Sequence, residues 1–191
     1  MEQDCLIALG SNQPTIAGDP AATLHAALAR LTGSDTDKGR KVQVKCSRFY
    51  RTPAFPPGAG PDFVNAAAML SSPDAPGTIL ARLHEIEAAF GRSREARWSA
   101  RTLDLDLLAI GEKVLPSPRI WQDWADLPPE EQASRAPSEL ILPHPRLQDR
   151  AFVLVPLAEI APAWRHPVLG LTVSEMLARL PASALEGIAP L

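Results

Sequence analysis

The segment 101–108 constrains this chain more than any other part of the sequence. Its leucines at positions 103, 105 and 107 alternate with polar residues, among them Asp104 and Asp106. An apolar residue at every second position is typical of a strand that buries one face. Because successive side chains of a strand point to opposite faces, both aspartates lie on the same face, with Cα atoms about 6.6–6.8 Å apart. The sequence therefore predicts a strand with two carboxylates on its polar face.

A basic segment lies directly upstream of this strand. Residues 92–98 contain three arginines together with Trp98. Carboxylate oxygens are ligands for hard cations and guanidinium groups bind phosphates, so the combination suits a metal–polyphosphate site. Two carboxylates at this spacing can bind two cations about 4 Å apart. The same residues also suit a plain solvent-exposed face and a salt-bridged helix end, and these alternatives stay open on spacing alone.

Composition limits the classes of function. A chain of 191 residues, 46% of them hydrophobic, is long enough for one domain with its own core, which we take to span residues 1–191. The net charge of −3 argues against a protein that coats nucleic acid, because such a protein needs a basic excess. Five arginines nevertheless lie between Arg82 and Arg101, so we expect a compact anionic ligand.

The sequence shows no apolar run of membrane-spanning length and no charged leader followed by an apolar segment. We therefore expect a cytoplasmic protein with neither a membrane nor a nucleic-acid partner. Cys5 and Cys46 fall in expected strands, which favours small core residues over a disulfide or metal pair. Nothing in the sequence demands more than a monomer.

The remaining chain divides into strands and amphipathic helices without strict alternation, which favours an α+β sandwich with a mainly antiparallel sheet. A proline-rich excursion at 116–140 is expected to hold one short helix. A capping box at Thr172–Glu175 predicts the start of the last helix. The other expected elements are strands at 5–9, 42–46 (continuing toward Tyr50), 63–70 and 103–108, helices at about 20–33 and 76–90, and a hairpin turn at 110–113.

Three further features lie outside the acidic strand. The prolines of Thr52–Gly58 make a stiff loop that carries Phe55. Asn65 lies inside an otherwise apolar strand, where a buried amide needs partners, either a ligand or backbone groups. Phe152 begins the apolar run 152–155, and there a core position and a ligand contact are both open.

Four segments together resemble the 6-hydroxymethyl-7,8-dihydropterin pyrophosphokinase family of folate biosynthesis: Ala8–Asn12, Ser47–Pro53 with Phe63–Ala66, Gly91–Asp106, and Pro143–Arg146 with Arg150–Phe152. They follow one another in the family's order and cover nearly the whole chain. The run Arg97-Trp98-x-x-Arg101-Thr102-Leu103-Asp104-Leu105-Asp106 is too long and unusual to match by chance.

The resemblance implies a ferredoxin-like fold and the transfer of diphosphate from ATP to the hydroxymethyl group of the pterin, with release of AMP. It implies two Mg²⁺ ions bound by Asp104 and Asp106, with Arg92 and Arg101 holding the phosphates during transfer. The residues implied for ATP are Glu87, Arg92, Arg101, His144 and Arg150, and those implied for the pterin are Thr52, Pro53, Phe55, Asn65, Trp98 and Phe152.

The chain also departs from the family pattern. The arginine-rich loop is one residue shorter and carries Glu95, Ala54 replaces a proline, and His84 replaces a glutamine. These differences leave open a non-catalytic relative that binds a pterin or a nucleotide on the same fold. A two-metal nuclease is the third hypothesis, but it lacks a basic surface for a long polyanion and leaves the aromatic residues and Asn65 unexplained.

Overall fold

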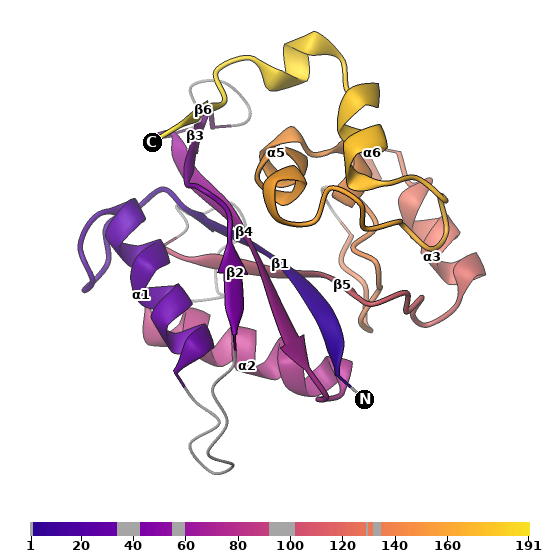
Figure 1. The fold of residues 1–191 in the computed structure, drawn as a ribbon, viewed down its shortest axis with the longest axis horizontal. Helices are drawn as coiled ribbons and strands as arrows, with labels where there is room; N and C mark the ends of the chain where they lie inside the picture. Colours follow the sequence, from indigo (N-terminus) through magenta and orange to yellow (C-terminus); the bar gives the residue numbers. More distant parts are fainter. Residues whose placement is uncertain (1, 34–42, 55–59, 92–101, 129, 132–134) are drawn as a thin grey trace.

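One sheet with helices on both faces forms the frame of the protein (Figure 1). The computed structural model describes residues 2–33, 43–54, 60–91, 102–128, 130–131 and 135–191. The helices and strands are β1 (Gln3–Ser11), α1 (Pro20–Thr32), β2 (Val44–Cys46), β3 (Tyr50–Thr52), β4 (Phe63–Ser72), α2 (Pro76–Ala89), β5 (Asp104–Ile110), α3 (Pro118–Ala125), η1 (Leu147–Asp149), α5 (Ala151–Ile160), α6 (Val173–Arg179), η2 (Ala182–Leu185) and β6 (Ala189–Pro190).

The sheet is antiparallel, with the strand order β5-β1-β4-β3-β6, and β2 also pairs with β4. The long strands β1 and β4 lie in the middle and β5 lies at one edge. When β2 and β3 are counted as one broken strand, the chain runs β–α–β–β–α–β through the sheet. The expected α+β architecture with a mainly antiparallel sheet is confirmed.

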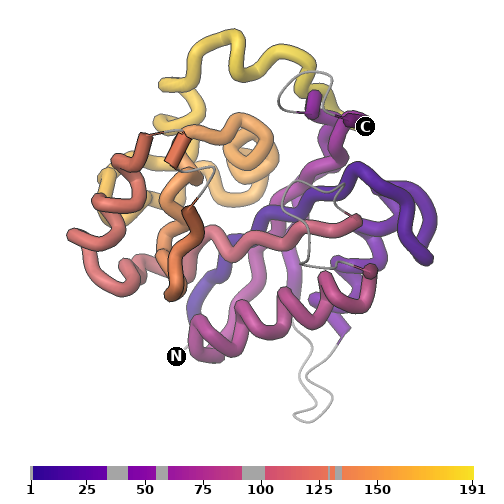
Figure 2. Tube along the Cα trace, turned by 180° about the vertical axis from the view of Figure 1, so that it is seen from behind, coloured from indigo at the N-terminus to yellow at the C-terminus, as the bar shows by residue number. Residues whose placement is uncertain are grey.

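The first face of the sheet is covered by α1 and α2, and Figure 2 shows α2 running beside β5. Leu24 and Leu31 of α1, with Leu83 of α2, pack on Ile7 and Leu9 of β1. Both helices begin as the sequence predicts. In α1 the Asp19 carboxylate accepts a hydrogen bond from the backbone N–H of residue 22 at 2.8 Å, and each helix has a proline in its first turn.

The second face carries a separate apolar cluster under α5 and α6 (Figure 1). Leu6 of β1 and Leu108 of β5 belong to this cluster together with Leu154 and Leu157 of α5. Because side chains alternate along a strand, this face is lined by the residues that lie between those of the first core. The capping box at Thr172 opens α6 as expected, and Met176 of α6 is buried in this cluster.

The strand expected from 42–46 toward Tyr50 is interrupted. At the break, Ser47 keeps the chain hydrogen-bonded to β4. Its backbone N–H donates to the Ala67 carbonyl at 2.9 Å, and its side-chain hydroxyl accepts from the Ala67 N–H at 3.0 Å. A side chain thus supplies an acceptor that a regular strand takes from the backbone, and the chain divides into β2 and β3. Residue 42 lies outside the described ranges.

The expected hairpin after β5 is wrong, although the turn itself is present. Gly111 adopts a φ of +52°, and the Lys113 N–H donates to the Ile110 carbonyl at 3.0 Å. The chain then leaves the sheet instead of returning along β5, and Leu115 pairs with Leu142.

The apolar run at 152–155 belongs to helix α5, which the sequence analysis did not anticipate. This helix buries residues on most of its circumference and contains Pro156. Because such a helix shows little amphipathic periodicity, its pattern resembles a buried strand as much as a helix.

The short helix expected in the excursion 116–140 is α3. Its Trp121 is fully buried and donates its indole N–H to the Pro143 carbonyl at 2.7 Å. Across the residues described, no helix has both the length and the apolar character needed to span a membrane.

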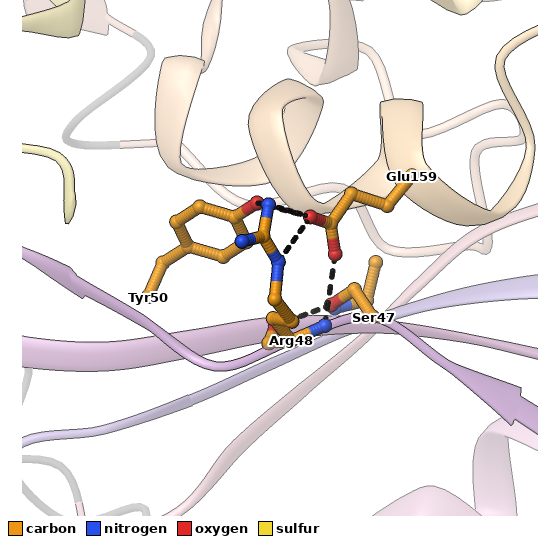
Figure 3. Close-up of polar contacts among 5 residues, drawn as sticks. Ser47, Arg48, Tyr50 and Glu159 are labelled. Carbon is orange, nitrogen blue, oxygen red and sulfur yellow. Dashed lines mark hydrogen bonds and ion pairs between the residues drawn. The ribbon is translucent and has the colours of Figure 1, made fainter. Parts of the chain in front are cut away.

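A polar network fastens α5 to the broken strand (Figure 3). Glu159 of α5 accepts hydrogen bonds from the Arg48 backbone N–H at 2.9 Å, the Arg48 Nε at 2.7 Å and the Tyr50 hydroxyl at 2.5 Å. Burial raises the pKa of Glu159, but these hydrogen bonds outweigh it and hold that pKa below its ordinary value. The network therefore fixes the position of α5 on the second face of the sheet.

Candidate active site

Strand register places the predicted pterin residue and the predicted metal residue in one row. Tyr50 pairs with Asn65, Asn65 pairs with Gly10, and Gly10 pairs with Asp104. Directly paired residues point to the same face, so all four lie on the second face, toward α5. Neighbouring strands are about 4.8 Å apart, which separates the Cα atoms of Asn65 and Asp104 by roughly 10 Å.

Gly10 makes room for the amide at the centre of this row. A Cβ on Gly10 would lie 2.7 Å from the Asn65 side-chain oxygen, a distance that real Cβ atoms do not show. The Asn65 Nδ2 donates to the Thr52 hydroxyl at 2.6 Å, and both residues are buried. The partner of the buried amide is thus a side chain of the same predicted pocket, and not a backbone cap.

Asp104 and Asp106 are both half-buried on this face, as the alternation in the sequence predicts. Nη1 of Arg150 lies 3.8 Å from Oδ2 of Asp106, and the Arg150 guanidinium carbon lies 5.6 Å from the centre of the Phe152 ring. Asp106, Arg150 and Phe152 therefore form one continuous surface. Phe152 is 39% exposed, so a core position for it is wrong.

Glu87 of α2 holds the strand that carries the two aspartates. Its side chain is 2% exposed, and Oε1 accepts a hydrogen bond from the backbone N–H of Leu105 at 2.7 Å. Leu105 lies between Asp104 and Asp106, at the edge of the sheet. Glu87 was expected to contact ATP, and that contact stays a prediction; in the structure its carboxylate satisfies a backbone donor of the edge strand.

A cavity of about 590 Å³ runs along the edge of β5, a volume within the range of small-molecule sites. Its walls come from α2, from β5 and from the segment 135–150, and they include the expected ATP residues that the structure describes. These residues are Glu87, His144 and Arg150, with Asp106 and His84 beside them.

His144 reaches this cavity as a neutral imidazole. Its backbone N–H donates to the Leu108 carbonyl at 2.7 Å, which fixes the segment against β5. Burial, with the positive charges of Arg150 and Arg146, lowers the pKa of His144 to about 3. Nδ1 accepts a hydrogen bond from the Arg146 N–H at 3.2 Å, so Nε2 carries the proton and is a donor.

Arg146 is a cavity residue that the sequence analysis did not select. Its Nη2 atom is buried without a hydrogen-bond partner within the described part of the chain, and burial together with Arg150 lowers its pKa. A buried guanidinium nitrogen without a partner is costly unless an anion binds it. The available signal was its place two residues after His144, since residues i and i+2 of a short loop can face the same cavity.

The structure does not bring together every expected residue. Thr52 is buried beside Asn65, whereas Pro53 is exposed and packs near Gly187, where an added Cβ would lie 2.6 Å from the proline ring. The remaining expected residues, Phe55, Arg92, Trp98 and Arg101, lie outside the described residues.

The donor set on β5 suits a magnesium–nucleotide complex. Among the residues described, no group of three or more His, Cys, Asp or Glu side chains is arranged to hold a metal ion. Mg²⁺ is usually held by one or two carboxylates together with substrate phosphates and water, not by a full protein cage. Asp104 and Asp106, beside a cavity lined by Arg146 and Arg150, fit that pattern.

Sequence comparison identifies relatives over most of the chain. Residues 6–162 match the family described as 7,8-dihydro-6-hydroxymethylpterin-pyrophosphokinase (HPPK). A protein of Pseudomonas aeruginosa named 2-amino-4-hydroxy-6-hydroxymethyldihydropteridine pyrophosphokinase is 37% identical over 186 residues, which are 97% of each chain. A protein of the same name from Synechocystis sp. is 39% identical over 146 residues, 76% of this chain, and the match spans 64% of that relative.

Comparison with solved structures gives the same fold. The wild-type HPPK-DHPS of Plasmodium falciparum matches with a TM-score of 0.63 at 13% identity, over 94% of this chain and 45% of that one. A triple mutant of the same protein with SDX-DHP matches with a TM-score of 0.65, over 98% of this chain and 46% of that one. The ferredoxin-like fold implied by the sequence is confirmed.

Proposed function

Because this chain belongs to the 7,8-dihydro-6-hydroxymethylpterin-pyrophosphokinase family, we propose that it transfers diphosphate from ATP to the hydroxymethyl group of 6-hydroxymethyl-7,8-dihydropterin. The products are AMP and the pterin diphosphate, an intermediate of folate biosynthesis. One observation carries the proposal. The register of β1, β4 and β5 brings the Asn65 amide and the Asp104 carboxylate onto one face with only Gly10 between them.

This row suits two substrates that must meet. The planar pterin has an edge of hydrogen-bond donors and acceptors that an amide such as Asn65 can match, with Thr52 orienting that amide at 2.6 Å. Phe152, exposed at the start of α5, offers a ring for one face of the pterin. Phe55, Pro53 and Trp98 remain proposed members of this pocket.

The phosphate side of the site supports the reaction through charge and position. The pterin hydroxyl oxygen forms a bond to the β-phosphorus of ATP, the bond from that phosphorus to the bridging α,β-oxygen breaks, and the electron pair leaves with AMP while the hydroxyl proton is released. Such transfers depend on alignment and on charges placed where negative charge develops. Arg150, Arg146 and the Nε2–H of His144 line the cavity beside Asp106 and supply these donors.

Asp104 and Asp106 would hold Mg²⁺, and we propose two ions shared between these carboxylates and the phosphates. When bound, the metal neutralises charge on the polyphosphate. Arg92 and Arg101 are proposed to hold the transferring phosphates. Glu87 keeps the acidic strand in place through the Leu105 N–H.

We further propose that the 191 residues act as one monomeric domain in the cytoplasm. Cys5 and Cys46 are free thiols, which suits a reducing compartment.

Formation of AMP tests the proposal. The purified chain is incubated with ATP, Mg²⁺ and 6-hydroxymethyl-7,8-dihydropterin, and nucleotides are separated by chromatography. We expect AMP only when both the pterin and Mg²⁺ are present. Binding of the pterin without AMP formation would instead support a non-catalytic relative on the same fold.

A further inference from the structure

The cavity beside β5 extends well beyond the acidic strand. Leu80, His84 and Glu87 of α2 all line it, at helix positions i, i+4 and i+7. A helix rises 1.5 Å per residue, so Leu80 lies about 10 Å from Glu87 along the axis. Since Glu87 is hydrogen-bonded to the strand between the two aspartates, Leu80 marks a region of the cavity that is remote from them.

The excursion 116–140 contributes much of the remaining wall, and it brings aromatic and apolar side chains to the cavity. Trp124 and Leu127 line the cavity from α3 and the turn after it, and Leu140 lines it from the end of the excursion. Together with Leu80 they give an aromatic and apolar portion. Asp106, Arg146 and Arg150 line the same cavity on the side of the acidic strand, and the excursion also contributes the charged side chains of Arg135 and Glu139.

Trp124 is held in position by its own helix. Trp121 lies one helical turn earlier, is fully buried, and is fastened to the Pro143 carbonyl. The Ser117 hydroxyl caps α3 by accepting from the Ile120 N–H at 3.3 Å. The guanidinium carbon of Arg135 lies 5.4 Å from the centre of the Trp124 ring, and Nη1 of Arg135 is paired with Glu131 at 2.9 Å. The ring is thus half-buried and supported before any ligand binds.

A cavity with a charged portion and an aromatic portion matches a nucleotide, which joins a polyphosphate to a flat base. We propose that Trp124, Leu127 and Leu140 of the excursion complete the nucleotide site and that Trp124 stacks on the base of ATP. The inference rests on the proposed function for the identity of the nucleotide, but it assigns a role to a segment and a residue beyond the pterin and phosphate sites. Because every base has a flat π-face, Trp124 contributes to affinity more than to the choice among bases.

Calorimetric titration of the wild-type chain and of Trp124→Ala with Mg²⁺–ATP and with Mg²⁺–tripolyphosphate separates the base from the phosphates. Stacking of one base contributes about 1–3 kcal/mol by alanine substitution, so we expect the Kd for ATP to rise about 5- to 150-fold. The Kd for tripolyphosphate should stay within about twofold, because that ligand has no base. Trp124→Phe, which keeps an aromatic face, should recover most of the ATP affinity.

Two controls keep the result interpretable. Gln122→Ala changes an exposed residue of the same helix and should leave both affinities unchanged. Thermal unfolding of Trp124→Ala and Trp124→Leu checks the fold, and Trp124→Leu preserves apolar volume without a π-face. Equal ATP affinity of the wild type and Trp124→Leu would overturn the inference while the proposed function stands. Absence of pterin-dependent AMP formation by the wild type would overturn the proposed function and the inference together.

Discussion

The two faces of the sheet are built from adjacent residues of the same strands, but one face carries hydrophobic core residues and the other carries the polar residues of the site. On the face under α1 and α2, Leu9 pairs with Ala66 and with Leu105, and all three are at most 2% exposed. One residue further along β1, on the face under α5, Gly10 pairs with Asn65 and Asp104. The first row belongs to the hydrophobic core, and the second is a row of polar side chains with a glycine between them. Because successive side chains point to opposite faces, a substitution in one row leaves the side chains of the other row in place.

The comparison predicts the largest functional effect at Asp106. Asp106→Asn keeps the shape of the side chain but removes a charge that faces the site, so kcat/KM for AMP formation should fall at least about 10³-fold, roughly 4 kcal/mol in the transition state. The midpoint of thermal unfolding should change by only about 2 °C. Asp4→Asn is a matched control, since Asp4 is an exposed carboxylate at the far end of β1. Normal turnover of Asp106→Asn would show that the acidic pair is not part of the site.

Leu9→Ala should lower stability and leave turnover nearly unchanged, the opposite of Asp106→Asn. Leu9 is 1% exposed in the core under α1 and α2, and truncation of such a leucine costs about 2–5 kcal/mol of unfolding free energy. Denaturant unfolding measures this loss. At a temperature where the variant stays folded, its kcat should lie within about threefold of the wild type. A large fall in kcat without a loss of stability would contradict the division between the two faces.

Acid should weaken the packing on the α5 side. His166 is fully buried between Trp121 and Trp164, and burial lowers its pKa to about 4 from an ordinary value of 6.5. Between these values the unfolded chain binds the extra proton, so the His166 contribution to stability is complete above pH 6.5 and is lost as the pH falls toward 4.

The variant His166→Asn isolates this contribution. In the wild type, His166 Nδ1 accepts hydrogen bonds from the backbone N–H groups of residues 168 and 169, and the side-chain oxygen of asparagine can accept the same two bonds but does not titrate. The difference in unfolding free energy between wild type and variant should shrink by about 2–3 kcal/mol from pH 7 to pH 4. A difference that is the same at both pH values would contradict the assignment.

Gly10→Ala tests the gap in the polar row. The new Cβ would lie 2.7 Å from the Asn65 side-chain oxygen, so the amide must move from its place beside Thr52. We expect the KM for the pterin to rise about tenfold, which corresponds to about 1.4 kcal/mol, while the KM for ATP stays near the wild-type value. A rise in the KM for ATP alone would place the pterin away from Asn65.

The smallest effect is expected at the network that fastens α5. Tyr50→Phe removes one donor to Glu159, at 2.5 Å, and should cost about 1 kcal/mol of unfolding free energy. Turnover at saturating substrate should stay within about twofold, because the Tyr50 hydroxyl points to α5 and not into the cavity. A large loss of turnover would contradict this prediction and would mean that activity depends on the hydrogen bond between Tyr50 and Glu159.

Much of the fold follows from local patterns in the sequence. The alternation at 103–107 predicted the strand and the common face of its two aspartates, and the capping box at Thr172–Glu175 predicted the start of α6. Helix α5 escaped prediction because it is apolar on most sides. The break after β2 was not predicted, because it depends on the hydrogen bond that the Ser47 hydroxyl accepts from Ala67 of β4, a partner distant in the sequence.

The site was less accessible to sequence reasoning than the fold. Asn65 and Asp104 are far apart in the chain, and only the pairing of both strands with β1 brings them into one row. The cavity roles of Arg146 and Trp124 depend on how the segments after β5 fold back along the sheet edge. No local pattern contains that long-range geometry. The remaining site residues were predicted from the resemblance to a family, and they stay predictions.

A crystal structure with Mg²⁺, a non-hydrolysable α,β-methylene analogue of ATP and the pterin tests the central claim most directly. The account predicts metal bound to Asp104 and Asp106, the pterin edge within hydrogen-bond distance of the Asn65 amide, and the hydroxymethyl group directed toward the β-phosphate across Gly10. Metal bound away from these aspartates, or a pterin on the face under α1 and α2, would contradict it.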